Sequence, residues 1–531
     1  MMTRSIRRSR APVCTGLRGE RCPTGGVVKC SDPAVVRPRC GQTRRPRSSP
    51  LRFAFSSPNR QALHVSIAVH ATSAAPGTSL RGVPLTISVI GTGYLGVVHA
   101  ACMADLGHTV VAIDNDAAKV ASLSRGVPPI YEPGLGELLT SVLPTGRLRF
   151  TTDYAEAAGA DAHFICVGTP QRKGEHAADT SYVFSAAQSL APHLRHHALV
   201  VGKSTVPVGT AARLLDRLQS GAPEGVTVRL AWNPEFLREG FAIEDTVAPD
   251  RFVYGVNGAH AEADVALLDE VYAGPLATGT PRLVTDFATA ELVKVAANAF
   301  LATKISFINA MAEVCEAAGA DVVKLADAIG HDDRIGRKFL NAGVGFGGGC
   351  LPKDIRAFMA RAGELGADQA LTFLREVDDI NIRQRSRMVD LAREQCSGTL
   401  IGKRVAVLGA AFKPNSDDIR DSPALDIAEA VRKAGAVVTV YDPKAMDAAR
   451  RVHPGLDYAH TVEDACLGAD VVLHLTEWKQ FRELDPAKLA VVVANPAIID
   501  GRNALDCDLW QRAGWVYRAL GRPNVRVADA F

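Results

Sequence analysis

The sequence of 531 residues contains no uninterrupted apolar run of the roughly 20 residues that a membrane-spanning helix needs. It has no CxxC pair, and its histidines and cysteines form no cluster with the spacing of metal ligands. Its eleven cysteines are dispersed, which is typical of free thiols in a reducing compartment. These absences predict a soluble cytoplasmic protein that binds neither a membrane nor a metal ion.

Acidic residues are scarce in one part of the chain only. Residues 1–84 contain 15 lysines and arginines against two acids, Glu20 and Asp32, although the formal charge of the whole chain is only +3. The remainder therefore has 45 basic and 55 acidic residues, a net charge of about −10. No nucleic-acid-binding surface is indicated on this acidic body.

The basic segment also lacks hydrophobic periodicity, so it cannot bury enough apolar surface to offset the entropy of ordering it. We expect residues 1–84 to be a disordered tail, or an extension that does not belong to the working protein. An organellar transit peptide is an alternative, because the segment is rich in Arg and Ser and poor in acids. A nucleic-acid or membrane arm is another, whereas a secretory signal fits poorly, because no compact apolar segment follows the first arginines.

From Leu85 onward, apolar strand-like runs alternate with helical stretches, which predicts parallel sheets covered by helices. The alternation stops from about Phe287 to Cys396, where apolar residues recur at helical spacing, and it returns at Lys403. The expected strands are Ile87–Ile90, Val110–Ile113, Ala162–Val167, Leu199–Val201, Val228–Ala231, Val405–Leu408, Val437–Tyr441, Val471–Leu475 and Ala490–Val493. The sequence thus predicts an α/β fold: two Rossmann-like doubly wound parallel-sheet domains, residues 85–286 and 399–531, joined by a central helical block, residues 287–398.

A glycine-rich motif, Gly91-Thr92-Gly93-Tyr94-Leu95-Gly96, directly follows the first expected strand and precedes a helical stretch. In such a unit the first glycine makes a tight turn, the second admits a pyrophosphate, and the third lets helix and strand pack closely. The helix N-terminus adds N–H groups and a positive dipole end. A glycine turn without a ligand is the alternative, but the strand and helix on either side favour dinucleotide binding.

An acidic residue stands where a dinucleotide site needs one. The second expected strand ends in Asp114, 18 residues beyond Gly96, where a carboxylate can bind the adenosine ribose and disfavour the 2′-phosphate of NADP. NAD is therefore the expected cofactor, with Lys119 offsetting part of the charge. Thr169 and Thr205 follow later strands and are expected at the same crevice, although turn chemistry alone explains their Pro and Gly neighbours.

The stretch Gly343–Asp354, GVGFGGGCLPKD, places five glycines within seven residues, which permits close backbone approach to a ligand. Pro352 favours the start of a helix, so Cys350 would lie at a helix N-terminus, where a thiol pKa is lowered. Lys353 and Asp354 would project near the cysteine. The pattern predicts an activated nucleophile, and a buried free cysteine is the alternative.

Two other segments space polar residues regularly. Asn233–Gly240 follows an expected strand and carries two carboxylates four residues apart, those of Glu235 and Glu239. Lys294 and Asn298 lie at i and i+4 on one helical face. Taken alone, Lys294 and Asn298 are better explained as solvated helix residues.

Taken together, these segments resemble the UDP-glucose/GDP-mannose dehydrogenase family from about Leu85 to the end of the chain. The matching pieces, in family order, are GTGYLG, STVPVG, NPEFLREG, ELVKVAANAFLATKISFINAMAEVCEAAGADV, DDRIGRKFL, GVGFGGGCLPKD, GAAFKPNSDDIRDS and IIDGRN. ELVKVAANAF and DDRIGRKFL look closer to the UDP-glucose branch. The resemblance implies oxidation of UDP-glucose to UDP-glucuronate with two NAD reduced, and another nucleotide sugar, chiefly GDP-mannose, is the alternative.

The resemblance also implies a role for each matching residue. Catalysis would need a nucleophile, Cys350, and two residues that stabilise an oxyanion, Lys294 and Asn298. It would also need an acid that helps orient a water, Asp354, and a proton-handling pair, Glu235 with Thr205. The cofactor would contact Gly91, Gly93, Tyr94, Leu95, Gly96, Asp114, Lys119, Thr169, Thr205, Lys353 and, near the nicotinamide, Glu239. The sugar nucleotide would contact Glu235, Phe236, Leu237, Lys294, Asn298, Arg334, Asn341, Gly343, Gly345, Gly347, Phe412, Lys413 and Arg502.

The implied chemistry explains why a cysteine is needed. Turning a primary alcohol into an acid takes two hydride transfers, and a thiolate can trap the intermediate aldehyde as a thiohemiacetal that is oxidised to a thioester. A two-electron hydroxyacid dehydrogenase needs no such cysteine and is disfavoured, while a non-enzymatic NAD-sensing protein is a further alternative. Two residues depart from the family pattern and leave the sugar specificity open. Many members have Ser at the position of Gly349, and the animal enzymes have Phe at the position of Leu351.

The helical block has more apolar positions than a connector needs, notably along Phe300–Val314 and Leu371–Ile382. This surplus predicts a buried interface, most simply that of a two-fold homodimer. The resemblance implies that residues 85–286 bind NAD, that 287–398 form the dimer and that 399–531 bind the sugar nucleotide. It further implies that Arg334 reaches into the partner's site, whereas a solvated loop arginine is the alternative.

The tail prediction is testable by truncation. A chain that starts near Ser79 should keep its dehydrogenase activity and its melting temperature, because residues 1–80 lack periodicity and precede the first strand. Activity assays and thermal melts of both chain lengths check this. A large loss of either property would mean that the tail packs on the body.

Overall fold

The computed structural model describes residues 84–195 and 198–523. Apart from Pro84, the tail predicted for residues 1–84 lies outside the described residues, so its disorder stays a prediction. The last eight residues of the predicted 399–531 domain lie outside them as well.

Within the described residues, the first sheet has the strand order β3-β2-β1-β4-β5-β6-β7-β8. Its neighbouring strands pair in parallel, except that β6 and β7 are antiparallel. The strands are β1 Thr86–Ile90, β2 Thr109–Ile113, β3 Leu148–Thr151, β4 Ala162–Ile165, β5 Leu199–Gly202, β6 Arg229–Trp232, β7 Phe252–Val256 and β8 Arg282–Thr285. The predicted doubly wound sheet is confirmed, and β3, β7 and β8 are additional to the prediction.

Helices cover both faces of this sheet, because its central strands are apolar on both sides. In β1, Ile87 and Val89 belong to one apolar cluster and Ile90 belongs to the other. The helices are α1 Tyr94–Asp105, α2 Ala117–Ser124, α3 Leu135–Val142, α4 Ser181–Leu190, α5 Thr210–Gly221, α6 Ala242–Val247, α7 Ala261–Val271 and α8 Ala273–Ala277, with short 3-10 turns η1 Leu143–Thr145, η2 Tyr154–Ala157 and η3 Ala191–His193.

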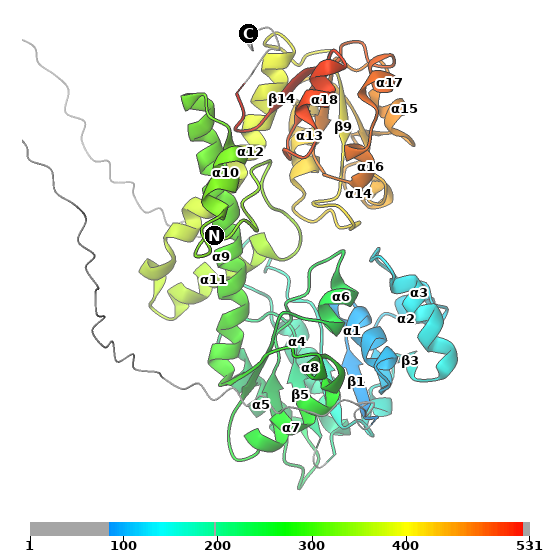
Figure 1. Cartoon of the computed structure of the whole chain (residues 1–531). Helices are drawn as coiled ribbons and strands as arrows, with labels where there is room; N and C mark the ends of the chain where they lie inside the picture. The colour runs from blue at the N-terminus through cyan, green and yellow to red at the C-terminus, as the bar shows by residue number, and fades with distance from the viewer. Residues whose placement is uncertain (1–83, 196–197, 524–531) are drawn as a thin grey trace, which may run out of the picture. The chain divides into compact units, whose positions relative to one another are not determined.

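A helical block follows, as predicted, and contains no strand between Phe287 and Cys396 (Figure 1). It consists of α9 Phe287–Ala318, α10 Val322–Gly330, α11 Leu351–Glu364, η4 Asp368–Leu371 and α12 Phe373–Gln395. The side chain of Asp286 caps α9 by accepting from the N–H of Thr289 at 2.9 Å, and Gly319 ends the helix in the left-handed conformation that glycine adopts readily.

By length and composition, α9 is the one helix within the described residues that could cross a membrane. No uninterrupted apolar run marks α9 in the sequence, because a few charged residues are spaced widely along it. In the fold, α9 packs against α11 and α12 and buries Glu291 and Asn298. It therefore serves as the central helix of the block.

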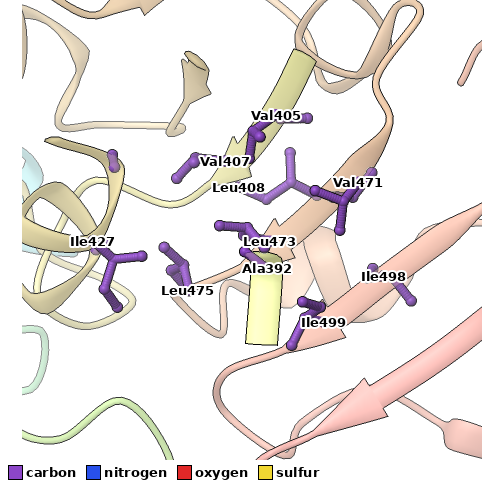
Figure 2. Packing of buried hydrophobic residues seen from close by; sticks show 14 of the residues in the cluster. Ala392, Val405, Val407, Leu408, Ile427, Val471, Leu473, Leu475, Ile498 and Ile499 are labelled. Carbon is purple, nitrogen blue, oxygen red and sulfur yellow. The ribbon is translucent and has the colours of Figure 1, made fainter. Parts of the chain in front are cut away.

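The second sheet, within residues 404–519, is wholly parallel, with the order β11-β10-β9-β12-β13-β14. Its strands are β9 Arg404–Leu408, β10 Val437–Tyr441, β11 Asp457–Tyr458, β12 Val471–His474, β13 Ala497–Asp500 and β14 Val516–Ala519. Its helices are α13 Pro423–Lys433, α14 Met446–Val452, α15 Val462–Cys466, α16 Lys479–Arg482, α17 Pro486–Ala490 and α18 Cys507–Arg512. Figure 2 shows part of its core, a single apolar cluster that includes Val407, Leu473 and Ile499 of adjacent strands, Ile427 of α13 and Ala392 of α12.

One predicted strand is wrong. Ala490 ends helix α17, Val491 is 84% exposed, and Val492 and Val493 follow in a turn where they are only partly buried. The strand is the next apolar run, Ala497–Asp500, whose four residues are all buried. Hydrophobicity alone does not tell which of these two adjacent runs forms a strand. The position of the turn between them determines which run pairs with β12 in the sheet.

The core of the second sheet gives a prediction about stability. Leu473 is fully buried, so Leu473→Ala should lower the free energy of unfolding by about 2–5 kcal/mol through lost burial and the cavity it leaves. Ile401→Ala is the matched control, because Ile401 is 77% exposed and its loss should cost less than about 0.5 kcal/mol. Urea unfolding of both variants checks this, and equal losses would contradict the assigned core.

Candidate active site

The first βα turn has room for a pyrophosphate. Gly91 has a φ of 90°, and a Cβ there would lie 2.8 Å from the side chain and 3.1 Å from the backbone of Val167. A Cβ on Gly96 would overlap the carbonyl oxygen of Gly91. Gly93, by contrast, has nothing within 4 Å of its would-be Cβ, and α1 begins directly after it with Tyr94 and Leu95. The three glycines therefore fit a dinucleotide as the spacing predicted.

Asp114 lies buried at the end of β2, close to the same turn. It accepts from the backbone N–H of Thr92 at 2.8 Å and from the Thr92 hydroxyl at 2.9 Å. Lys119 is paired with it at 2.9 Å, as predicted. Burial opposes the charge of Asp114, but the hydrogen bonds from Lys119 and Thr92 outweigh it and hold the pKa of this carboxyl below its usual value. A carboxylate kept ionised here suits a ribose and repels a 2′-phosphate.

The later strand ends converge on this region. The Thr169 hydroxyl donates to the carbonyl oxygen of Thr205 at 2.7 Å, so the two predicted turns are joined. Thr205 also lines a pocket together with Lys353 and Asp354 of α11. Folding thus brings the end of β5 next to the start of α11, the helix that follows Cys350.

Cys350 is the N-cap residue of α11, and Pro352 stands in the first turn, as predicted. The residue is exposed, yet the surrounding protein removes much of the bulk water from its sulfur. This desolvation raises the thiol pKa, the Asp354 carboxylate raises it further, and Lys294 opposes them only in part. The expected lowering of the thiol pKa at a helix N-terminus is therefore wrong for this state of the protein.

Polar side chains of α9 and α11 meet beside the cysteine. The Asn298 amide donates to Oδ2 of Asp354 at 2.7 Å, and the Lys353 ammonium binds Oδ1 of the same carboxylate at 2.5 Å. The Lys294 ammonium lies over the Phe236 ring, 5.5 Å from its centre. The view of Asn298 as a solvated helix residue is wrong, because Asn298 is buried in this network.

Glu235 and Thr205, the predicted pair, line two different pockets. Glu235 lines a second pocket, where its carboxylate is 2.9 Å from the ammonium of Lys203. Its other oxygen accepts from the N–H groups of Phe236 and Leu237 at 2.7 and 3.0 Å. Glu235 therefore fixes the backbone of its own loop, and its proton-handling role stays a prediction.

Glu239 is a second buried carboxylate, after Asp354, whose charge acts on the cysteine. It accepts from the Ser416 hydroxyl at 3.1 Å and lies 3.4 Å from the Arg420 guanidinium. Burial, followed by the charge of Asp418, raises its pKa to about 7. Its charge in turn adds to the raised pKa of Cys350.

The glycines of the cysteine loop face protein rather than open space. A Cβ on Gly343 would lie 2.6 Å from the carbonyl oxygen of Gly501, and one on Gly348 would lie 2.7 Å from the Phe412 ring. Cβ atoms on Gly345, Gly347 and Gly349 would overlap Asn381, Asp421 and Arg420. These glycines therefore let the loop pack closely against its neighbours, and their contact with a ligand stays a prediction.

Arg502 is hydrogen-bonded to other residues that were predicted to contact the substrate. Its guanidinium donates to the carbonyl oxygens of Gly345 at 2.9 Å and Phe412 at 3.1 Å. The Lys413 ammonium lies over the Phe412 ring, 5.3 Å from its centre. Burial lowers the pKa of Lys413, and the carboxylate of Glu239 opposes this.

Two predicted substrate contacts lie apart from this cluster. Arg334 is 89% exposed and pairs with Asp332 at 2.7 Å. Asn341 is exposed and accepts from Arg337 at 2.7 Å. Neither is brought to Cys350 by the contacts of its own chain.

Lys203 and Glu132 also belong to this site, although no sequence motif singled them out. The Glu132 carboxylate accepts from the N–H of Gly240 at 2.6 Å, from that of Ala242 at 2.7 Å and from the Tyr94 hydroxyl. It therefore ties the glycine-rich turn to the Glu239 loop. A charged residue directly after the buried run of β5 was a usable signal for Lys203, because lysine is seldom buried without a partner.

Comparisons with known proteins agree with this geometry. Three domain models of the UDP-glucose/GDP-mannose dehydrogenase family match: the NAD binding domain over residues 85–275, the central domain over 288–383 and the UDP binding domain over 406–507. The chain belongs to this family. No group of three His, Cys, Asp or Glu side chains that could hold a metal ion occurs in the described part of this family member.

Named relatives are similar over nearly their whole length. The chain is 43% identical to UDP-glucose 6-dehydrogenase of Rhizobium meliloti over 441 residues, which are 83% of this chain and all of the relative. A UDP-glucose dehydrogenase structure from Pyrobaculum islandicum matches with a TM-score of 0.76 and 39% identity, over 83% of this chain and 98% of that one. A UDP-D-ManNAc dehydrogenase structure from Pyrococcus horikoshii matches with a TM-score of 0.72 and 28% identity, over 83% and 100%.

The raised pKa of Glu239 predicts a pH-dependent stability. In the unfolded chain this carboxyl loses its proton near pH 4.5, and in the folded protein near pH 7. Between these values the folded state holds a proton that the unfolded state has released, so stability falls as the pH rises. Relative to the unsubstituted protein, Glu239→Gln should gain on the order of 2–3 kcal/mol between about pH 5 and about pH 8.

Urea unfolding of both proteins at the two pH values measures this difference. Glu244→Gln is the control, since Glu244 is exposed and its substitution should shift stability equally at both pH values. Identical pH profiles for Glu239→Gln and the unsubstituted protein would contradict the raised pKa.

Proposed function

We propose that this protein oxidises UDP-glucose to UDP-glucuronate, with two NAD reduced and a covalent intermediate on Cys350. The observation that carries the proposal is the cluster at the start of α11, where Cys350 lies beside the Asn298–Asp354–Lys353 network and the Lys294 ammonium. A simple two-electron dehydrogenase has no use for a thiol in this position.

The relatives support UDP-glucose as the substrate. The relative named as a UDP-glucose 6-dehydrogenase is 43% identical and the structure of a UDP-glucose dehydrogenase 39% identical, whereas the UDP-D-ManNAc enzyme is 28% identical. Asp114 supports NAD rather than NADP, because its carboxylate faces the turn where the adenosine ribose would lie. Cytoplasmic location and the predicted domain boundaries stay proposals.

NAD, when bound, would accept the hydride in each of the two oxidations, and in each the hydroxyl proton on the carbon being oxidised would pass to water. The Cys350 sulfur would then add to the aldehyde carbon, and the thiol proton would pass to the carbonyl oxygen. Lys294 and Asn298 would stabilise the negative charge on that oxygen while it develops. Because the pKa of Cys350 is raised, the positive charge of Lys294 is needed to make the thiolate accessible.

Loss of the second hydride from the thiohemiacetal carbon leaves a thioester on Cys350. A water then attacks the thioester carbonyl, the carbon–sulfur bond breaks, and the thiolate returns as the acid leaves. Asp354, held by Asn298 and Lys353, would orient this water together with Lys294. Fixing the attacking group in this way removes much of the entropic part of the barrier.

Cys350→Ser tests the covalent step. The variant should form UDP-glucuronate more than about 1,000-fold more slowly, because a hydroxyl is a far weaker nucleophile near neutral pH. NAD binding, measured by calorimetry, should persist. Cys507→Ser is the matched control, since Cys507 is another free thiol, at the start of α18, and its loss should leave turnover unchanged. Normal acid production by Cys350→Ser would exclude this mechanism.

We also propose that the protein works as a homodimer through the helical block. Phe300, Phe307 and Val314 of α9 recur every seven residues, so they share one face of the helix. They are 66%, 48% and 56% exposed in the single chain. Apolar side chains exposed in a row on a helix favour a contact with another subunit. In such a dimer we propose that the exposed Arg334 reaches into the partner's site, as the sequence resemblance implies.

Subunit mixing tests whether Arg334 acts in the partner's site. Arg334→Ala and Cys350→Ala subunits should each be nearly inactive alone. If Arg334 acts across the interface, a mixed dimer has one site with both defects and one with neither. Equal mixing should then restore about a quarter of the unsubstituted activity, because half of the dimers are mixed.

The rate of NADH formation before and after subunit exchange measures this recovery. No recovery after confirmed exchange would place Arg334 in its own subunit's site or in none. Full activity of Arg334→Ala alone would remove it from the mechanism.

A further inference from the structure

Lys203 follows strand β5 and is 3% exposed. Its ammonium lies 2.9 Å from Oε2 of Glu235, and it donates to Oδ1 of Asn233 at 3.1 Å and to the Tyr272 hydroxyl at 3.4 Å. Each of its three protons thus has an acceptor. Burying a lysine costs free energy even when it is paired, so such a residue needs a reason beyond stability.

The other oxygen of Glu235 holds the backbone of its own loop. Oε1 accepts from the N–H of Phe236 at 2.7 Å and from that of Leu237 at 3.0 Å. The Phe236 ring is stacked under the Arg251 guanidinium at 4.0 Å, and the Lys294 ammonium lies 5.5 Å from its centre. A continuous series of contacts therefore runs from the buried lysine to the lysine beside Cys350.

We propose that Lys203 is a positioning residue for the oxidation. Its charge fixes the Glu235 carboxylate, the carboxylate fixes the backbone of Phe236 and Leu237, and the Phe236 ring sets where the Lys294 ammonium lies. The inference rests on the proposed function, in which Lys294 stabilises the developing oxyanion. A shift of the ring would misplace that charge and slow the chemical steps more than it weakens binding.

His99, Asn233 and Tyr272 cannot take over this task. Arg251, the other cation that lines the pocket around Lys203, lies over the Phe236 ring. His99 lines the same pocket and is fully buried. Burial, and after it the charge of Lys203, holds the pKa of His99 well below its usual value. His99 therefore stays neutral, and Asn233 and Tyr272 carry no positive charge. The loss of Lys203 would leave the partly buried Glu235 carboxylate without the ammonium that pairs with it at 2.9 Å.

The test is a double-mutant cycle on the full chain, with Lys203→Met, Glu235→Gln and the double variant. Steady-state assays with UDP-glucose give kcat and KM, calorimetry gives NAD affinity, and thermal melts report folding. Lys403→Met is the control, because it removes a more exposed lysine and its 3.4 Å ion pair with Asp470 in the second sheet domain.

We expect Lys203→Met to lower kcat at least about tenfold, with a smaller change in KM and unchanged NAD affinity. In the Glu235→Gln background the same substitution should change kcat less than about twofold, because the partner charge is already gone. If Lys203→Met alone fails to fold, the double variant, which removes both charges, is compared with Glu235→Gln instead.

An unchanged kcat of Lys203→Met, or a full additional loss in the Glu235→Gln background, would overturn the inference. An unsubstituted protein that does not oxidise UDP-glucose would refute the proposed function instead, so the two failures can be told apart.

Discussion

The close approach of the loop 343–349 to its neighbours is the constraint on which the site depends. Any side chain on Gly345 or Gly348 would collide with Asn381 of α12 or with the Phe412 ring. The loop is thereby wedged between the helical block and the second sheet domain, and it delivers Cys350 to the start of α11. The entropy that glycine loses on folding is the cost of this fixed position.

Buried charges around the thiol are organised in pairs rather than left single. Asp354 is held by Lys353 and Asn298, Glu235 is held by Lys203, and Glu239 is held by residues of the second sheet domain. Pairs of this kind add little to stability, because desolvation offsets most of their attraction. They fix geometry instead, and a site that must stabilise an oxyanion needs groups that are already in place.

The sequence was sufficient for the architecture and for the residues at the strand ends, because hydrophobic periodicity and the glycine motif are local signals. It placed Cys350 at a helix start because Pro352 marks one. It could not give the direction of the thiol pKa, which depends on burial and on how Asp354 and Lys294 are arranged around the sulfur. Nor could it foresee that Glu235 turns toward Lys203, since that pairing exists only after β5 and β6 lie side by side.

The ratio of NADH formed to UDP-glucose consumed tests the central claim, a four-electron oxidation through Cys350, most directly. Both quantities can be measured in one reaction, by absorbance for NADH and by chromatography for the sugar nucleotide. The account predicts two NADH for each UDP-glucose, with UDP-glucuronate as the product and no free aldehyde. One NADH for each UDP-glucose, with an aldehyde released, would contradict it.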